Sequence, residues 1–161
     1  IPGSDATHLT PRDIFDIAEG TRPGDREAAR ESFRRFGEVA GDVISQALTI
    51  IDGIVVLGGG LTGAAKYFMP SLLAEMRGEI GTFAGDRFPR LQMQTYDLDS
   101  PEEAAEFVRE KSVPVAVPHS EEHVRYHHIR QTPVVRSKLG ASRAIALGAY
   151  AFAIAELDRR Q

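Results

Sequence analysis

Residues 54–66 read IVVLGGGLTGAAK, and this stretch decides the fold class of the chain. Ile54 to Leu57 are apolar throughout, which predicts a short strand buried on both faces. Helix-forming residues follow the glycines, so the stretch predicts a strand, a tight turn and a helix. A tight turn alone explains one or two of the glycines. Three in a row at the carboxyl end of a strand favour close approach of a ligand to Gly58, Gly59 and Gly60.

Sequence signals for the start of a helix occur on both sides of this stretch. Thr10 and Ser100 each precede a proline and acidic residues, as an N-cap does, and Glu103 completes a capping box with Ser100. A long helix begins at Asp25, and its apolar residues recur every three or four positions, which predicts that they form its core face. These apolar residues are Phe36, Val39, Ala40, Val43, Ile44, Ala47, Leu48 and Ile51.

The rest of the chain predicts a mixed α/β fold rich in helices. Prolines confine the segment around 113–117 to the edge of any sheet. The apolar run 144–155 is typical of a buried helix. The predicted elements are a helix over 64–77 with a kink or fresh start at Pro70, a loop over 78–89, a strand over 90–98, a helix over 101–110, a strand over 133–139 and a helix over 141–158.

Composition limits the classes of function. The chain has 161 residues, enough for a single domain with a sizeable core. It carries 23 acidic against 19 basic residues and no concentrated basic patch, so we expect no nucleic acid to bind it. It has no cysteine, no run long enough to span a membrane and no signal peptide at its start. We expect a soluble, cytoplasmic, globular protein with no membrane contact.

Two phosphate-binding motifs compete for the glycine turn. Gly58, Gly60 and Gly63 fit the spacing of a dinucleotide fingerprint, but that motif needs an acidic residue about twenty positions on, at the end of the next strand. The predicted loop over 78–89 occupies that window, and Asp97 comes too late. A P-loop needs Gly-Lys followed by a hydroxyl, whereas Lys66 lies between alanine and tyrosine. Both motifs are therefore disfavoured.

A second motif raises the question of zinc. His119, Glu122 and His123 have the spacing of an inverted zinc-peptidase motif, which places two imidazoles one helical turn apart. Such a site needs a secure helix and a further ligand. Neighbouring prolines and valines favour a loop and an edge strand instead, so we expect surface histidines and no metal site.

Three segments in a fixed order resemble one family. They are the long helix, the stretch IDGIVVLGGGLTGAAKYFMPSLL at 51–73 and the stretch VRSKLGASRAIALGAYAFA at 135–153. Together they resemble the C-terminal part of ROK proteins, a family of sugar kinases and sugar-responsive repressors. The opening THLTPRDIFDIAEGTRPGDREA, residues 7–28, also resembles the segment that precedes the long helix in that family, whereas residues 78–135 match loosely.

The resemblance implies an actin-like ATPase fold of the ribonuclease H-like type, of which this chain would be the C-terminal lobe. In that fold the glycine turn lies against the adenosine part of ATP. The nucleotide-binding residues implied here are therefore Gly58, Gly59, Gly60, Leu61 and Thr62. Thr62 could contact the nucleotide, although capping of the following helix is the favoured role.

The resemblance also implies what the chain lacks. The family's N-terminal phosphate loop, catalytic aspartate, sugar-binding histidine and glutamate, and cysteine-containing zinc motif are all missing from this sequence. The chain is thus expected to be one domain, residues 1–161, of a larger protein without its N-terminal lobe and zinc motif, with no catalytic or metal-binding residue of its own and no kinase activity alone.

The expected function of the parent protein is glucokinase-like. It would be a homodimeric transferase of carbohydrate metabolism that uses ATP and Mg²⁺ to phosphorylate a hexose. A sugar-responsive ROK repressor without kinase activity is the alternative, and a dinucleotide-binding oxidoreductase is a third possibility. The residues that would decide between kinase and repressor lie outside this sequence.

Overall fold

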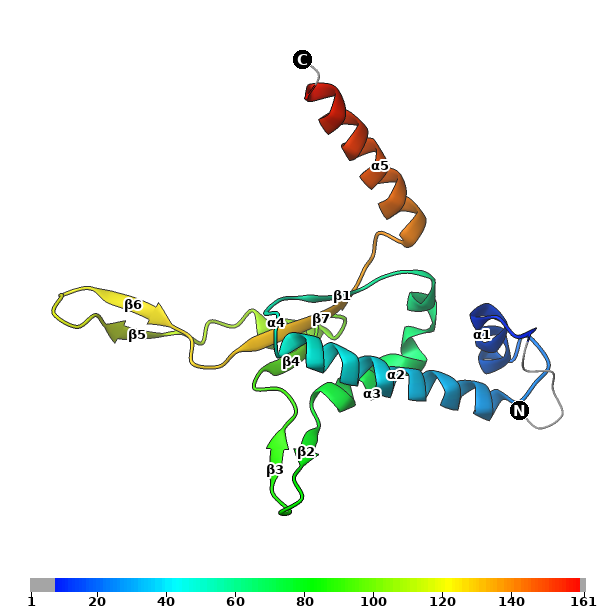
Figure 1. The fold of residues 1–161 in the computed structure, drawn as a ribbon, viewed down its shortest axis with the longest axis horizontal. Helices are drawn as coiled ribbons and strands as arrows, with labels where there is room; N and C mark the ends of the chain where they lie inside the picture. Colours follow the sequence, from blue (N-terminus) through cyan, green and yellow to red (C-terminus); the bar gives the residue numbers. More distant parts are fainter. Residues whose placement is uncertain (1–7, 160–161) are drawn as a thin grey trace.

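The computed structural model describes residues 8–159 and has the mixed α/β, helix-rich architecture that the sequence predicts (Figure 1). The helices are α1 (Pro11–Glu19), α2 (Arg26–Leu48), α3 (Ala65–Met76), α4 (Pro101–Phe107) and α5 (Ala141–Asp158), with the 3₁₀ helix η2 (Gly60–Ala64) before α3. The strands are β1 (Val55–Leu57), β2 (Glu79–Gly81), β3 (Arg87–Pro89), β4 (Gln94–Asp97), β5 (Val113–Ala116), β6 (His123–Tyr126) and β7 (Gln131–Arg136).

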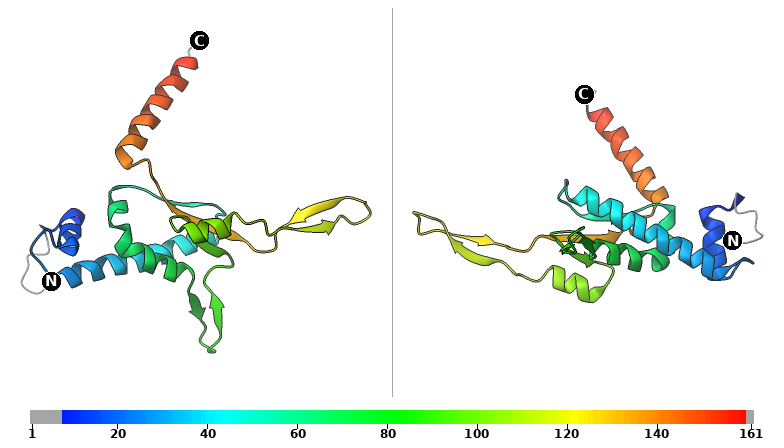
Figure 2. Two further views of the ribbon diagram at one scale, coloured as in Figure 1. Left: turned by 180° about the vertical axis from the view of Figure 1, so that it is seen from behind. Right: turned by 60° about the horizontal axis from the view of Figure 1, so that its bottom comes forward.

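A three-stranded parallel sheet forms the centre of the molecule. Its order is β1-β7-β4, with Val55 opposite Val134 on one side of β7 and Thr95 opposite Thr132 on the other. The remaining strands pair as two antiparallel hairpins, β2 with β3 and β5 with β6. Figures 1 and 2 show that both hairpins and α5 project away from the body in different directions.

The predicted helix starts are confirmed in most details. Thr10 and Asp13 form a capping box at α1, and the Asp25 carboxylate accepts hydrogen bonds from the first turn of α2. The Ser100 hydroxyl caps α4, but the capping box predicted there does not close. The Glu103 carboxylate instead accepts a hydrogen bond from the Asp97 N–H, 2.7 Å away at the end of β4.

The predicted core face of α2 is correct only in part: Leu48 is buried, and Ala40 and Ile44 pack against the core. Phe36, Val39 and Val43 are exposed, and the face that meets α3 contains Gly37, Gly41 and Ser45. A Cβ added at Gly37 would lie 2.3 Å from the Phe68 carbonyl oxygen, so the two helices approach as closely as their backbones permit. Small residues carry little hydrophobicity, so apolar periodicity does not identify them and also includes neighbouring residues that the structure leaves exposed.

One face of the strand, and the last helix, were predicted to be buried and are exposed; Val55 and Leu57 on the other face of the strand pack against the core. Val56 in β1 is 60% exposed, and Phe152 in α5 is 71% exposed. β1 is an edge strand paired with β7 alone. Within residues 8–159 nothing covers its second face or surrounds α5, although both sequences are as apolar as buried elements.

Three local predictions also need correction. Residues 78–89, predicted as a loop, contain the β2–β3 hairpin. Of the two outcomes expected at Pro70, a fresh helix start does not occur, since α3 runs on from Ala65 to Met76 with Pro70 inside it. The first turn after β1 is a 3₁₀ helix, so the α-helix begins at Ala65. Proline removes one donor inside a helix, and buried neighbours such as Met69 and Leu72 hold this helix together despite that loss.

Candidate ligand-binding site

The glycine turn follows β1 directly and bends the chain into η2. Gly59 has φ 95° and ψ −173°, a conformation that is nearly restricted to glycine. The Thr62 hydroxyl donates a hydrogen bond to the Gly59 carbonyl oxygen at 2.8 Å and thereby closes the turn. Thr62 caps neither η2 nor α3, so the favoured capping role is wrong and the hydroxyl serves the turn itself.

The turn borders open space. A Cβ added at Gly59, Gly60 or Gly63 would meet no atom within 4 Å, and one at Gly58 would meet only Ser137, at 3.9 Å. Contacts within the described chain therefore do not require glycine at positions 60 and 63. Their small size leaves room for something outside residues 8–159.

An apolar pocket of about 360 Å³ opens beside this turn. Helices α1 and α2 bring Phe15 and Phe33 to it from distant parts of the sequence, and Arg12 lies over the Phe15 ring at 5.5 Å. The lining residues are Pro11, Arg12, Phe15, Phe33, Gly60, Leu61, Gly63 and Ala64. Among the five predicted residues, Gly60 and Leu61 line the pocket, whereas Gly58, Gly59 and Thr62 lie outside its lining.

A network of aromatic and charged groups supports the pocket from behind. Tyr67 stacks on Phe33 with ring centroids 5.9 Å apart and meets Phe15 edge-on at 6.4 Å. Its hydroxyl donates to the Glu19 carboxylate at 2.8 Å, and the Lys66 ammonium lies 2.7 Å from the same carboxylate. The hydrogen bonds from Lys66 and then Tyr67 lower the pKa of Glu19. α1 is thereby fixed to the start of α3.

A polar depression of about 410 Å³ lies on the other side of the turn. Thr62 and Gly63 form one wall, so Gly63 borders both spaces. Arg136 forms an ion pair with Asp99, whereas Lys138 forms no ion pair with any residue of the described part of the chain. The turn thus borders an apolar pocket and also a polar depression, in which the Lys138 ammonium has no ion-pair partner within the described residues.

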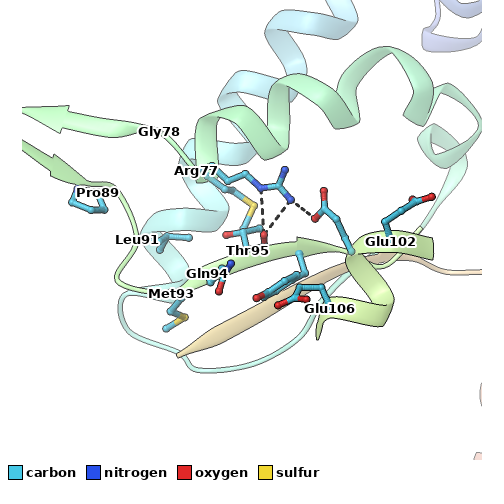
Figure 3. A pocket seen from close by; sticks show the side chains of 12 residues that line it. Arg77, Gly78, Pro89, Leu91, Met93, Gln94, Thr95, Glu102 and Glu106 are labelled. Carbon is cyan, nitrogen blue, oxygen red and sulfur yellow. Dashed lines mark hydrogen bonds and ion pairs between the residues drawn. The ribbon is translucent and has the colours of Figure 1, made fainter. Parts of the chain in front are cut away.

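Another cavity, of about 540 Å³, lies at the far end of α3, where its polar groups bond to one another (Figure 3). The Arg77 guanidinium donates to the Thr95 carbonyl oxygen at 3.1 Å and contacts Glu103. Glu103 also accepts from the Asp97 N–H. These bonds satisfy the free edge of β4, and we interpret the cavity as part of the sheet's structural edge.

The histidine motif lies outside any helix, in agreement with the predicted loop and edge strand. His119 lies in a turn with φ 62°, and His123 begins β6. Within residues 8–159 no three histidine, aspartate or glutamate side chains are close enough to hold a metal ion together. In the same range no helix is both long and apolar enough to cross a membrane.

The sequence predicted the glycine turn but not the two phenylalanines that line the pocket beside it. Phe15 and Phe33 lie in separate helices upstream of β1, and no spacing rule connects them to a glycine turn. The helix periodicity could place Phe33 on a face of α2, but which face meets the turn depends on the packing of α2 against α3.

One solved structure shares this architecture along most of the chain. It is the crystal structure of a glucokinase from Parabacteroides distasonis, 46% identical in sequence with a TM-score of 0.75. The match covers 93% of this chain and 40% of that glucokinase. No family model matches the sequence, and no curated protein matches it. The chain is therefore similar, along nearly its whole length, to about two fifths of a glucokinase.

Proposed function

We propose that this chain is the nucleotide-binding, C-terminal part of a ROK-type sugar kinase with an actin-like ATPase fold. The parent protein would transfer the γ-phosphate of ATP to a hexose in the cytoplasm. The observation that carries the proposal is the apolar pocket of about 360 Å³ beside a glycine turn that no internal contact explains. Its volume lies within the range of about 300–1,000 Å³ typical of ligand sites. The similarity to a glucokinase supports the same function.

Adenosine fits the two spaces around the turn. The adenine ring would lie against Phe15 and Phe33 in the apolar pocket, where aromatic faces favour stacking. Gly60 and Gly63 would allow the ribose to approach the backbone closely. The phosphates would extend past Gly63 toward Lys138, whose ammonium complements their charge.

The described residues do not offer a comparable binding site for magnesium. Asp99 is the only carboxylate in the polar depression, and it is already paired with Arg136. No group of metal ligands occurs within residues 8–159. We therefore assign neither the metal nor the catalytic base to this chain. Both would come from the rest of the parent protein, of which this chain would form one domain.

The alternatives are weaker. A sugar-responsive ROK repressor would use the same lobe without kinase activity, and the glucokinase neighbour favours the kinase. A dinucleotide-binding fold would place an acidic residue on the strand next to β1. The neighbour of β1 is β7, and Asp97 ends β4, which lies beyond it.

Titration of the protein with ATP and, separately, with NAD tests the proposal. We expect saturable binding of ATP and much weaker binding of NAD, measured by calorimetry or by changes in amide NMR signals. Binding of NAD without binding of ATP would refute the adenosine site. Ligand-induced changes confined to residues away from the glycine turn would refute its location.

A further inference from the structure

The apolar pocket beside the glycine turn contains a single side chain that forms hydrogen bonds. Of the eight residues that line the pocket, seven have an apolar side chain or none, and the eighth is Arg12. A guanidinium carries N–H donors and no acceptor. Through its side chains the pocket therefore offers hydrogen bonds only to ligand groups that accept them.

The Arg12 guanidinium has a defined position at this pocket. Its Nε donates a hydrogen bond to the Asp16 carboxylate at 3.2 Å, one helical turn further along α1. The centre of the guanidinium lies 5.5 Å from the centroid of the Phe15 ring. The side chain is 77% exposed, so a ligand that enters from solvent can reach it. Asp16 occupies Nε and leaves the two terminal amino groups to other partners.

Backbone acceptors beside the pocket are already occupied. The Thr10 carbonyl oxygen, just before α1, accepts from the Ile14 N–H at 3.1 Å. The Gly59 carbonyl oxygen, just before η2, accepts from the Thr62 N–H at 3.3 Å and from the Thr62 hydroxyl at 2.8 Å. A ligand group that only donates, such as an exocyclic amine, therefore finds neither of these two oxygens free.

The carboxylates of α1 do not supply the missing acceptor. Asp13 and Asp16 both lie outside the lining of the pocket. Asp13 belongs to the capping box and accepts from the Thr10 N–H at 2.9 Å and from the Thr10 hydroxyl at 2.7 Å. Asp16 accepts from Arg12. The polar groups around the pocket thus favour a ligand that presents acceptors.

The proposed binding mode turns one edge of the purine toward Arg12. With the ribose against Gly60 and Gly63 of η2, the edge of the base that lies away from the sugar faces the lining residues that come from α1. Adenine presents an amine donor at position 6 of that edge and an acceptor at N7. Guanine and hypoxanthine present acceptors at both O6 and N7, which a guanidinium matches with two N–H groups.

We propose, on the basis of the nucleotide site put forward above, that the pocket binds 6-oxopurine nucleoside triphosphates such as GTP and ITP at least as tightly as ATP. Arg12 is the residue that sets this preference. A site selects strongly between similar ligands when its own polar groups are left unpaired by the wrong one. The lining has no side-chain acceptor that the adenine amine would satisfy, so it has no means of selecting adenine.

Titration of the protein with ATP and ITP isolates position 6 of the base. ATP carries an amine there, and ITP carries a carbonyl oxygen with a proton on the adjacent ring nitrogen. Calorimetry should show that ITP binds at least as tightly as ATP. The expected advantage is about threefold to tenfold, because a charged donor strengthens a hydrogen bond whereas its exposure to water weakens it.

A matched pair of variants tests the role of Arg12. Arg12→Leu removes the donors and keeps a side chain that favours helix. It should weaken ITP binding about threefold to tenfold and change ATP binding less than about twofold. Arg35→Leu is the control, because Arg35 is 74% exposed, pairs with Glu31 four positions away in α2 and lies outside the pocket. It should change neither affinity, and thermal melting checks that both variants fold.

The outcomes separate this inference from the proposed function. If the protein binds neither ATP nor ITP, the nucleotide site is refuted and the preference at position 6 is refuted with it. If the protein binds ATP more tightly than ITP, the inference is overturned and the nucleotide site stands. Equal weakening of ATP and ITP by Arg12→Leu, or an unchanged affinity for ITP, would also overturn it, because Arg12 would then not distinguish the two bases.

Discussion

At the scale of single residues, the glycines of the turn have different roles. Gly59 needs its backbone conformation, whereas Gly60 and Gly63 leave space. We expect Gly60→Val to fold normally, because a Cβ at this position meets no atom within 4 Å, and to weaken ATP binding at least tenfold. Nucleotide titration and thermal melting measure the two effects. Gly53→Val, also in open space but outside the pocket, is the control and should bind ATP normally.

Gly59→Ala should have the opposite profile. A residue forced into this sparsely populated backbone conformation costs about 1–3 kcal/mol, so the melting temperature should fall even without ligand. If Gly59→Ala melts like the wild type while Gly60→Val unfolds, the assignment of the two roles is reversed.

The Glu19 carboxylate should make the docking of α1 sensitive to acid. Its pKa is lowered in the folded protein, so its contribution to stability is complete above about 4.5, the ordinary value, and is lost as the pH falls through the folded value. Glu19→Gln removes this contribution. The wild type should therefore melt higher than Glu19→Gln above about pH 5, and the difference should shrink toward pH 3. A difference that grows in acid would contradict the network with Lys66 and Tyr67.

At the scale of elements, the close contact of α2 with α3 depends on the absence of side chains. A Cβ at Gly41 would lie 2.6 Å from the Leu72 carbonyl oxygen, and that backbone atom cannot move alone. We expect Gly41→Ala to cost about 1–3 kcal/mol, as overpacking does. Gly148→Ala in α5 meets no atom and should be neutral or slightly stabilising, since alanine favours helix. Thermal melting compares them, and equal effects would contradict the close contact.

The sequence was informative where local chemistry decides the structure. The caps at Thr10 and Asp25, the limits of α5 and the strand before the glycines follow from residue types within a few positions of each other. The buried face of α2 was predicted only in part, because Gly37 and Gly41 create a contact by being small. The apolar pocket was predicted only in part. Gly60 and Leu61 belong to the turn that the sequence identifies, whereas Phe15 and Phe33 reach the pocket through tertiary packing.

At the scale of the whole molecule, β1 and α5 present apolar side chains that nothing within residues 8–159 covers. The exposed side chains of β1 and α5 have the composition of buried elements, and the chain matches two fifths of a glucokinase. We expect the chain alone to phosphorylate no sugar, because losing the orientation of two substrates can forfeit about 7–11 kcal/mol. Adding the remaining part of a parent kinase should restore activity. Sugar-dependent ADP release by the 161-residue chain alone would show that it contains the catalytic base.

Photolabelling with 8-azido-ATP tests the proposed adenosine pocket most directly, because the azide would react where the adenine ring lies. Peptide mass spectrometry after irradiation locates the modified residues. The account predicts labelling in the segments that contain Phe15, Phe33 or Leu61, and loss of that labelling when excess ATP competes. Labelling that ATP does not prevent, or that falls on the cavity beside Gln94 and Tyr96 instead, would contradict the account.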